Sequence, residues 1–208
     1  MQENLMLIRS VCVYCGSQAG NDPAYLADAR LLGQSIAENG IRLVYGGGTR
    51  GIMGAVAESV RKAGGHVTGI IPEFLMDKEA TRDALAELDD LIVTNDMHER
   101  KHAMFERSDA FITLPGGIGT LEEVIEMMTW GQLGRHVKPV VFANTSGFWD
   151  PLLSLLDHMT QAGFIHTAHK VKPLVVTRAE DVIPALLSAQ NPQQGENLSG
   201  DAAVISRL

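Results

Sequence analysis

The residues with the clearest capacity for chemistry lie in the stretch 110–123, which reads AFITLPGGIGTLEE. Gly116, Gly117 and Gly119 allow a positive φ and a close approach of the backbone to a ligand. They follow a short apolar run that is typical of a buried strand, and they precede apolar residues at helical spacing. Free N–H groups and the positive end of the helix dipole bind anions at a helix N-terminus. The stretch therefore predicts a phosphate site.

The same stretch predicts where its strand ends and its helix begins. Pro115 cannot donate to a strand ladder, Thr120 is a favoured N-cap, and Glu123 follows at the spacing of a capping box. A P-loop would need Lys and Ser/Thr after its second glycine, and a dinucleotide loop would read G-x-G-x-x-G. A tight turn without a ligand is the alternative, but a turn alone does not need three glycines in four residues.

A second glycine-rich loop, GGGTRGIMG at 46–54, follows the apolar run 41–45. Two such loops at the carboxyl ends of strands in one α/β chain predict a shared crevice, and we place Gly46 and Gly47 in it. A glycine-tolerant turn with close packing of helix on sheet at Gly54 is the alternative.

The segment 98–102, HERKH, contains two overlapping patterns. H-E-x-x-H is the zinc-peptidase pattern, in which two histidines one turn apart bind the metal and the Glu activates water. No third ligand is evident and the segment follows a predicted parallel strand, so we expect no metal. The second interpretation assigns Arg100 and Lys101 as fixed positive charge beside the glycine loops. In the third interpretation, the segment is a solvated start of a helix without a functional role.

Cys12 and Cys15 form a C-x-x-C pattern. The predicted first strand points the two side chains to opposite faces, whereas a redox pair sits at a helix start. A zinc ribbon needs a second cysteine pair. We expect reduced thiols in the core.

Size and charge limit the classes of protein. The chain has 208 residues, 45% of them apolar, which suffices for one well-buried domain and is short for two. With 17 basic and 25 acidic residues, the net charge of −8 argues against a nucleic-acid or membrane-surface binder. The sequence shows no apolar run of about 18 residues and no basic start of a signal peptide, so we expect a cytoplasmic protein.

Strands and helices are predicted to alternate. The expected strands are 8–14, 41–45, 66–71, 91–94, 110–114, 139–143 and 174–177. The expected helices are 22–40, 52–63, 96–107, 120–133, 150–162 and 181–188, with a loop and partial helix at 73–90.

This order predicts an α/β fold, a single-domain, Rossmann-like, doubly wound parallel sheet with helices on both faces. The ligand site should lie beyond the carboxyl ends of the strands, where strands two, four and five deliver their loops. We expect the domain to cover residues 1–189. Residues 190–208, rich in Asn, Gln, Gly and Ser, are expected to form a flexible tail.

Three ordered motifs resemble those of the LOG family, the cytokinin-activating phosphoribohydrolases long mislabelled as lysine decarboxylases. Residues 115–123 match P-G-G-x-G-T-x-x-E, residues 97–101 match M-H-x-R-K, and residues 46–54 match G-G-G-x-x-G-x-M-G. The resemblance covers residues from about Val11 to about Thr177. It places Glu99 at a variable position of its motif, which explains the H-E-x-x-H match.

The resemblance implies hydrolysis of the N-glycosidic bond of a purine nucleoside 5′-monophosphate, of cytokinin type or AMP, to free base and ribose 5-phosphate. It implies that Arg100 and Glu123 form the catalytic pair. The implied substrate contacts are Glu79, Lys101, Gly116, Gly117, Ile118, Gly119, Thr120, Leu121, Glu122 and Thr129. Glu73 and Glu87 are alternatives to Glu79. Ile118 replaces a tyrosine of many plant relatives, which leaves the preferred base open.

Family members pair through the apolar helix that includes Met127, Met128, Thr129 and Trp130 and through Leu133, so the resemblance implies a homodimer. No nucleic-acid or membrane partner is expected, and the reaction requires neither metal nor organic cofactor. A decarboxylase with pyridoxal phosphate would need a Schiff-base lysine. Lys101 is the only candidate near the loops, and its neighbours do not resemble such a site.

The residues suit the implied chemistry. Cleavage of the C1′–N9 bond passes through an oxocarbenium-like sugar, which needs negative charge and a positioned water, and Glu123 can supply both. Arg100 stays charged and can anchor the substrate and compensate the departing purine. We expect one of Glu122 and Glu123 to cap its helix and the other to face the sugar. A carrier of a phosphorylated ligand is the alternative, but it has no need for Arg100 and Glu123 together.

Overall fold

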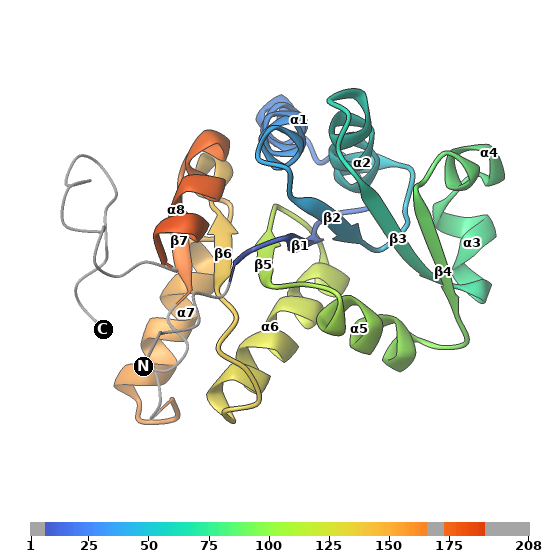
Figure 1. Ribbon diagram of the computed structural model, residues 1–208. Helices are drawn as coiled ribbons and strands as arrows, with labels where there is room; N and C mark the ends of the chain where they lie inside the picture. The colour runs from blue at the N-terminus through green and yellow to red at the C-terminus, as the bar shows by residue number, and fades with distance from the viewer. Residues whose placement is uncertain (1–6, 166–172, 190–208) are drawn as a thin grey trace, which may run out of the picture.

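The computed structural model describes residues 7–165 and 173–189, and the predicted tail 190–208 lies outside them. Seven strands form one sheet in which every pairing is parallel, in the order β4-β3-β2-β1-β5-β6-β7 (Figure 1). The predicted α/β, doubly wound fold is confirmed. The strands are β1 (Ser10–Tyr14), β2 (Arg42–Tyr45), β3 (Val67–Pro72), β4 (Asp90–Thr94), β5 (Ala110–Thr113), β6 (Val140–Ala143) and β7 (Leu174–Val176).

Helices connect the strands close to the predicted positions, and the segment expected as a loop with a partial helix contains two short helices, α3 and α4. The helices are α1 (Pro23–Glu38), α2 (Gly51–Lys62), α3 (Glu73–Glu79), α4 (Arg82–Ala86), α5 (Met97–Glu106), α6 (Ile118–Gln132), α7 (Asp150–Gln161) and α8 (Val182–Ala189). Short 3₁₀ turns occupy Thr145–Gly147 and Ala179–Asp181. No helix of the described ranges is long and apolar enough to cross a membrane.

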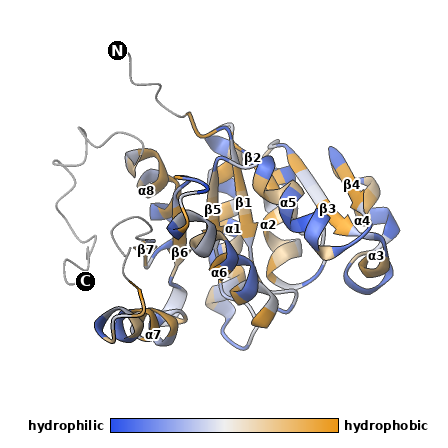
Figure 2. Ribbon diagram, turned by 90° about the horizontal axis from the view of Figure 1, so that it is seen from below, coloured by the Kyte–Doolittle hydropathy of each residue, from blue (hydrophilic) through white to orange (hydrophobic). Residues whose placement is uncertain are grey.

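Each face of the sheet carries its own apolar layer. Val11 and Val13 of β1 pack in the layer with α1, α2 and α8, whereas Cys12 and Tyr14 pack in the layer with α5, α6 and α7 (Figure 1). Because the inner strands β1, β2, β3, β5 and β6 are covered on both faces, they form nearly continuous apolar runs rather than alternating ones, whereas the edge strand β4 is largely exposed. Seen from below, α7 lies beside β6 and β7, and α3 and α4 lie at the β4 edge (Figure 2).

The two cysteines follow this division. Cys12 belongs to the layer of α5 and α6, and Cys15 to the layer of α1 and α2. Both are buried and free. The prediction of reduced core thiols on opposite faces is confirmed, because successive strand residues point to opposite sides of the sheet.

The order of the strands reverses where β1 meets β5. From there the chain runs outward to β4 in one direction and to β7 in the other. Such a switch point opens a crevice at the carboxyl ends of the two neighbouring strands. The crevice therefore lies after β1 and β5. The segments after β2, β4 and β5 meet as predicted, because Arg100 of α5, which follows β4, bonds Gly46 O of the loop after β2, and Lys101 pairs with Glu122 of α6, which follows β5. The part played by β1 was not predicted, because it depends on a strand order that a single sequence does not show.

Gly51 allows a test of how tightly the crevice loops pack. Its φ is +59°, and an added Cβ would lie 2.5 Å from the backbone carbonyl carbon of Ser17. Gly64 has a φ of +77° but open space around it. Both Gly→Ala changes incur backbone strain, and the change at Gly51 adds a clash with backbone. We expect Gly51→Ala to lower the free energy of unfolding by roughly 1–3 kcal/mol more than Gly64→Ala in urea denaturation. Equal losses of the free energy of unfolding in the two variants would contradict the close contact between Gly51 and the Ser17 backbone.

Candidate active site

The glycine loop after β5 leads directly into α6. This helix begins at Ile118, with Gly117 in extended conformation as its N-cap and no side chain capping it. Thr120 is therefore a buried residue of the first turn rather than the N-cap, and that prediction was wrong. The reason is that glycine can itself serve as N-cap, so the helix starts before the first capping side chain.

The first turn of α6 presents free backbone donors. Leu121 N donates to Gly117 O at 3.0 Å, which is the first bond of the helix. Within the described residues, no acceptor bonds the N–H groups of Ile118, Gly119 and Thr120. Ile118 is 87% exposed, so the turn is open to solvent. Three aligned N–H groups at an open helix N-terminus are suited to bind a phosphate.

The second glycine loop differs, because the first amides of its helix are occupied. Ile52 N and Met53 N donate to Gly16 O at 3.1 and 3.2 Å. The start of α2 is thus bound to the loop after β1 rather than open to an anion. The sequence similarity of the two loops does not extend to their hydrogen bonds.

The second loop instead holds Arg100 of α5. Arg100 is 5% exposed, and its Nη2 donates to Gly46 O at 3.1 Å. A Cβ on Gly46 would lie 2.0 Å from that nitrogen, so only glycine leaves room for the guanidinium. The buried Arg100 Nε has no hydrogen-bond partner among the described residues. A buried guanidinium with a free donor is suited to bind an oxygen of a ligand.

Lys101, the next residue of α5, is bound to α6. Its Nζ lies 2.6 Å from Glu122 Oε1 and 2.9 Å from Glu126 Oε2. Burial opposes the charge of Lys101, but the ammonium donates to the carboxylates of Glu122 and Glu126, which hold the pKa of Lys101 above its ordinary value. Lys101 thus orients α6 against α5. Sequence reasoning missed Glu126, although its position one turn after Glu122 places both on one helix face.

Glu123 has no hydrogen bond or ion pair among the described residues, so neither it nor Glu122 caps α6. That expectation was wrong because Gly117 begins the helix. Burial raises the pKa of the Glu123 carboxyl to about 7. The positive charge of Arg100 opposes the rise, and the carboxylates of Glu122 and Glu79 add to it. A carboxyl that ionises near neutral pH can serve as a general base or as a negative charge beside a cationic sugar.

Glu79 stands at the end of α3, where its carbonyl accepts from Thr49 N at 2.9 Å. This bond brings α3 to the second glycine loop. Of the three glutamates considered for this position, Glu73 is exposed and Glu87 pairs with Arg61. Only Glu79 lies near enough to influence Glu123.

Several buried polar atoms around the crevice have no partner. Native structures leave few such atoms, so a cluster of them at one place indicates a site for a ligand or water. Those at this end of the sheet, among the described residues, are Tyr14 OH, Glu79 Oε2, Arg100 Nε and Thr113 Oγ1.

The remaining predicted residues divide into two groups. Gly47 and Gly116 belong to the two loops, and Leu121 is a partly exposed residue of the first turns of α6. Thr129 lies about 16 Å further along this helix than Ile118, at the usual rise per residue. Its hydroxyl donates to Ile125 O at 2.8 Å. Within one chain, the fold does not bring Thr129 to the glycine loop.

The H-E-x-x-H side chains face solvent. His98 and His102 are exposed, and the Glu99 carboxylate accepts from Asn95 N at 2.9 Å. Glu99 N in turn donates to Asp96 Oδ1, so this glutamate stabilises the start of α5. No group of three or more His, Cys, Asp or Glu side chains in residues 7–165 and 173–189 could hold a metal.

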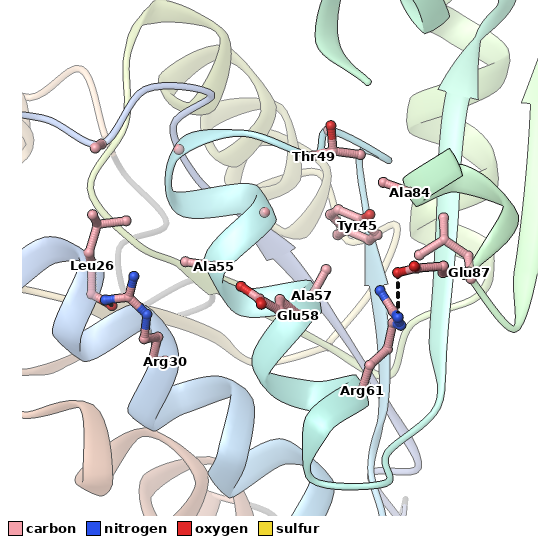
Figure 3. A pocket seen from close by; sticks show the side chains of 15 residues that line it. Leu26, Arg30, Tyr45, Thr49, Ala55, Ala57, Glu58, Arg61, Ala84 and Glu87 are labelled. Carbon is pink, nitrogen blue, oxygen red and sulfur yellow. Dashed lines mark hydrogen bonds and ion pairs between the residues drawn. The ribbon is translucent and has the colours of Figure 1, made fainter. Parts of the chain in front are cut away.

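A surface pocket of about 390 Å³ lies beside α2, and Gly48, Thr49 and Gly51 of the second glycine loop form part of its lining. Leu26 and Arg30 of α1 line it on one side of that helix, and Tyr45 and Glu87 line it on the other (Figure 3). Its main charges are already paired, since Arg61 Nη2 lies 2.5 Å from Glu87 Oε2. None of the unpartnered buried atoms lines this pocket. The crevice, not the pocket, is the candidate active site.

Comparison with known proteins agrees with the motifs. A family model described as "Possible lysine decarboxylase" matches residues 53–186. The chain belongs to this family, the LOG family. The LOG resemblance found in the sequence is thereby confirmed.

Curated LOG relatives cover most of the chain. A probable cytokinin riboside 5′-monophosphate phosphoribohydrolase of Oryza sativa subsp. japonica is 45% identical over 183 residues, which is 85% of this chain and 79% of the relative. A cytokinin riboside 5′-monophosphate phosphoribohydrolase of Arabidopsis thaliana is 41% identical over 191 residues, 88% of each chain.

Solved structures with the same fold include two molybdenum cofactor proteins. The molybdenum cofactor binding protein of Rippkaea orientalis has a TM-score of 0.64 and 27% identity, and the match covers 88% of this LOG chain and 98% of that chain. A molybdenum cofactor carrier protein of Chlamydomonas reinhardtii has a TM-score of 0.60 and 25% identity, with 86% and 98% covered.

The burial of Glu123 has a measurable effect on stability. The native pKa of about 7 exceeds the ordinary carboxyl value of 4.5, so the native state binds more protons between these values. The stabilising contribution of the protonated Glu123 carboxyl is complete below about pH 4.5 and is lost as the pH rises through 7. We expect Glu123→Gln to raise the free energy of unfolding by roughly 1–3 kcal/mol at pH 8 and to have little effect at pH 4.

Urea denaturation at the two pH values measures this difference. Glu38→Gln, at an exposed position of α1, is the matched control and should show a similar, small effect at both. A Glu123→Gln effect that does not depend on pH would contradict the raised pKa.

Proposed function

We propose that this protein hydrolyses the N-glycosidic bond of a purine nucleoside 5′-monophosphate and releases the free base and ribose 5-phosphate. The observation that carries the proposal is the combination, in one crevice, of free amides at the start of α6, the unpaired Glu123 carboxyl and the buried Arg100. The printed names of the curated relatives, which are cytokinin riboside 5′-monophosphate phosphoribohydrolases, support it.

In this proposal the 5′-phosphate binds the N–H groups of Ile118, Gly119 and Thr120, with the backbone of Gly116 and Gly117 beside it. Glu123 follows on the next turn of the same helix, which advances about 5.4 Å per turn. This spacing leaves room for a ribose between the phosphate and the carboxylate. Binding energy from the phosphate would then hold the sugar in position for attack.

Glu123 acts in its ionised form. Its negative charge stabilises the oxocarbenium-like sugar, and its oxygens orient the attacking water. Arg100 keeps its charge at all relevant pH values, and it anchors the substrate and compensates the negative charge that develops on the departing purine. Glu79, with its unpartnered oxygen, is the proposed additional substrate contact from α3.

The state of Lys101 argues against a decarboxylase. A Schiff-base lysine must be deprotonated to attack a carbonyl group. The Lys101 ammonium is instead held by Glu122 and Glu126, which raise its pKa. Lys101 and Glu122 contribute to the proposed site through this ion pair, which orients the start of α6. Leu121 and Ile118 remain proposed contacts at its exposed rim, whereas Thr129 lies too far along α6 to reach the site within one chain.

We further propose a homodimer in the cytoplasm. No residue of α7 is buried, and this helix carries both hydrophobic and hydrophilic residues (Figure 2). Leu133 and Val137, after α6, are 72% and 87% exposed, and Phe164, after α7, is 80% exposed. An interface between two chains would cover exposed apolar side chains of this size. The two free cysteines support a reducing compartment.

The test of the activity is incubation with AMP, N6-isopentenyl-AMP and adenosine, with chromatography of free base and ribose 5-phosphate. We expect release from the monophosphates only, unchanged by EDTA. Glu123→Gln and Arg100→Ala should each lower kcat/KM by roughly 10²- to 10⁴-fold, because each removes a charge used in the transition state. Arg61→Ala, in the pocket beside α2, is the matched control and should retain activity.

Binding of a nucleotide without hydrolysis would contradict the enzyme and favour the carrier of a phosphorylated ligand. Activity that appears only with added zinc would instead implicate His98 and His102.

Light scattering after size exclusion tests the dimer. The double variant Leu133→Asp, Val137→Asp should shift the mass from dimer to monomer, because two charges would have to be buried in the interface. Leu31→Asp, at an exposed apolar position on the opposite face, should leave the mass unchanged. A monomeric wild-type protein would contradict the proposal.

A further inference from the structure

Two buried hydroxyl groups lie side by side at the base of the crevice. Tyr14 and Thr113 are the last residues of β1 and β5, and they are paired in register. Ile112 and Leu114 pack in the layer of α1 and α2, so alternation places Thr113 on the opposite face with Tyr14. That face is covered by α6, the helix that carries Glu123.

Neither hydroxyl has a partner among the described residues. Both side chains are almost inaccessible to solvent, and both oxygens lack a hydrogen bond. Tyr14 cannot turn away easily, because its ring is stacked on Phe111 with centroids 5.9 Å apart. Buried hydroxyls in native proteins are nearly always bonded, and the neighbouring Cys12 sulfur is only a weak acceptor, so a stronger acceptor is expected from the side of α6.

Glu123 is the acceptor available. Its carboxylate has no hydrogen bond of its own in the described part of the chain. Burial raises the pKa of the Tyr14 phenol well above its ordinary value, and the contact with the Cys12 thiol and the nearby carboxyl group of Glu123 add to the rise. Tyr14 therefore stays protonated and remains a donor. The other carboxylate near it, Glu126, is already paired with Lys101.

We propose that the Tyr14 hydroxyl, with the Thr113 hydroxyl beside it, positions the Glu123 carboxylate by a hydrogen bond that runs through one buried water. Tyr14 is a positioning residue, since it acts on Glu123 and not on the substrate. The catalytic meaning of this bond rests on the proposed function. The bond itself does not, because it can be measured in the absence of turnover.

A donor to an ionised carboxylate favours its charged form. Removal of the hydroxyl should therefore raise the pKa of Glu123. Several other charged or titratable groups also influence Glu123, and all of them are unchanged by the substitutions below. These groups are Arg100 and Lys101 of α5, Glu122 of α6, Glu79 of α3, and Cys12 and Cys15 at β1.

The experiment compares Tyr14→Phe with Tyr45→Phe. Tyr45 is the matched control, because it is the last residue of the neighbouring strand β2, is equally buried and faces the opposite layer. The pKa of Glu123 is measured by NMR of ¹³C-labelled glutamate side chains, with the signal assigned through Glu123→Gln. We expect Tyr14→Phe to raise this pKa by about one unit, a tenfold change in the ionisation constant, and Tyr45→Phe to leave it unchanged.

The pH dependence of kcat/KM gives the second readout. In Tyr14→Phe the acid limb should move to higher pH by the same amount, with KM little changed. An unchanged Glu123 pKa would overturn the proposal, and so would a raised KM with an unchanged pKa, because Tyr14 would then contact the substrate. If Tyr14→Phe does not fold, the near-isosteric variant Thr113→Val tests the proposal by the same NMR measurement. We expect it to raise the pKa of Glu123 by a smaller amount, and an unchanged pKa would overturn the proposal.

The two proposals fail separately. If wild-type protein hydrolyses no nucleotide but Tyr14→Phe still raises the pKa of Glu123, the phosphoribohydrolase function is wrong and the hydrogen bond stands. If the wild-type protein hydrolyses the nucleotide and Tyr14→Phe leaves the pKa of Glu123 unchanged, the phosphoribohydrolase function stands and the proposed hydrogen bond is wrong.

Discussion

The backbone of Gly16 connects the parts of the crevice. Its N–H donates to Pro115 O at 3.0 Å, which fixes the glycine loop after β5, and its carbonyl accepts from Ile52 and Met53 at the start of α2. The N–H and the carbonyl of Gly16, in the loop after β1, thus bond to the loop after β5 and to the helix after β2. These bonds hold the three segments together at the switch point of the sheet. Because the Gly16 carbonyl accepts from Ile52 N and Met53 N of α2, α6 offers the more open set of first-turn amides of the two helices that follow the glycine loops, within the described residues.

The arrangement of charged groups in the crevice lowers the stability of the fold. Arg100 and Lys101 are neighbours on α5 and both are buried, yet they have different environments. Lys101 is neutralised by two carboxylates of α6, whereas Arg100 contacts a backbone carbonyl and keeps a free N–H. Glu123 is partly buried and has no hydrogen bond or ion pair among the described residues. Such unpaired groups reduce stability, and they are typical of sites that complete their hydrogen bonds only with a ligand. The surface pocket beside α2, where Arg61 and Glu87 satisfy each other, lacks this property.

The start of α6 agrees with its sequence pattern in part. The sequence predicted the strand, the glycine turn, the helix and the importance of Glu123. It assigned the cap to Thr120 and left the roles of Glu122 and Glu123 open, because capping preferences describe side chains and do not show when a glycine begins the helix. The pairing of Lys101 with Glu126 was not predicted, since the contact joins two helices 25 positions apart. The similar loop at 46–54 was predicted to share a crevice with the first loop, but the sequence did not show that a distant carbonyl, that of Gly16, accepts from two amides of its helix.

The sequence by itself determined the alternation of strands and helices, the parallel sheet buried on both faces, and the three motifs that identify the LOG family. These features depend on local periodicity, glycine positions and short spacings, which are visible in a single chain. Only the tertiary structure decided the strand order, the switch point between β1 and β5, and which amides and charges remain free. Those properties depend on contacts between segments far apart in sequence, such as Gly16 with Pro115 and Arg100 with Gly46, and on burial, which no local pattern specifies.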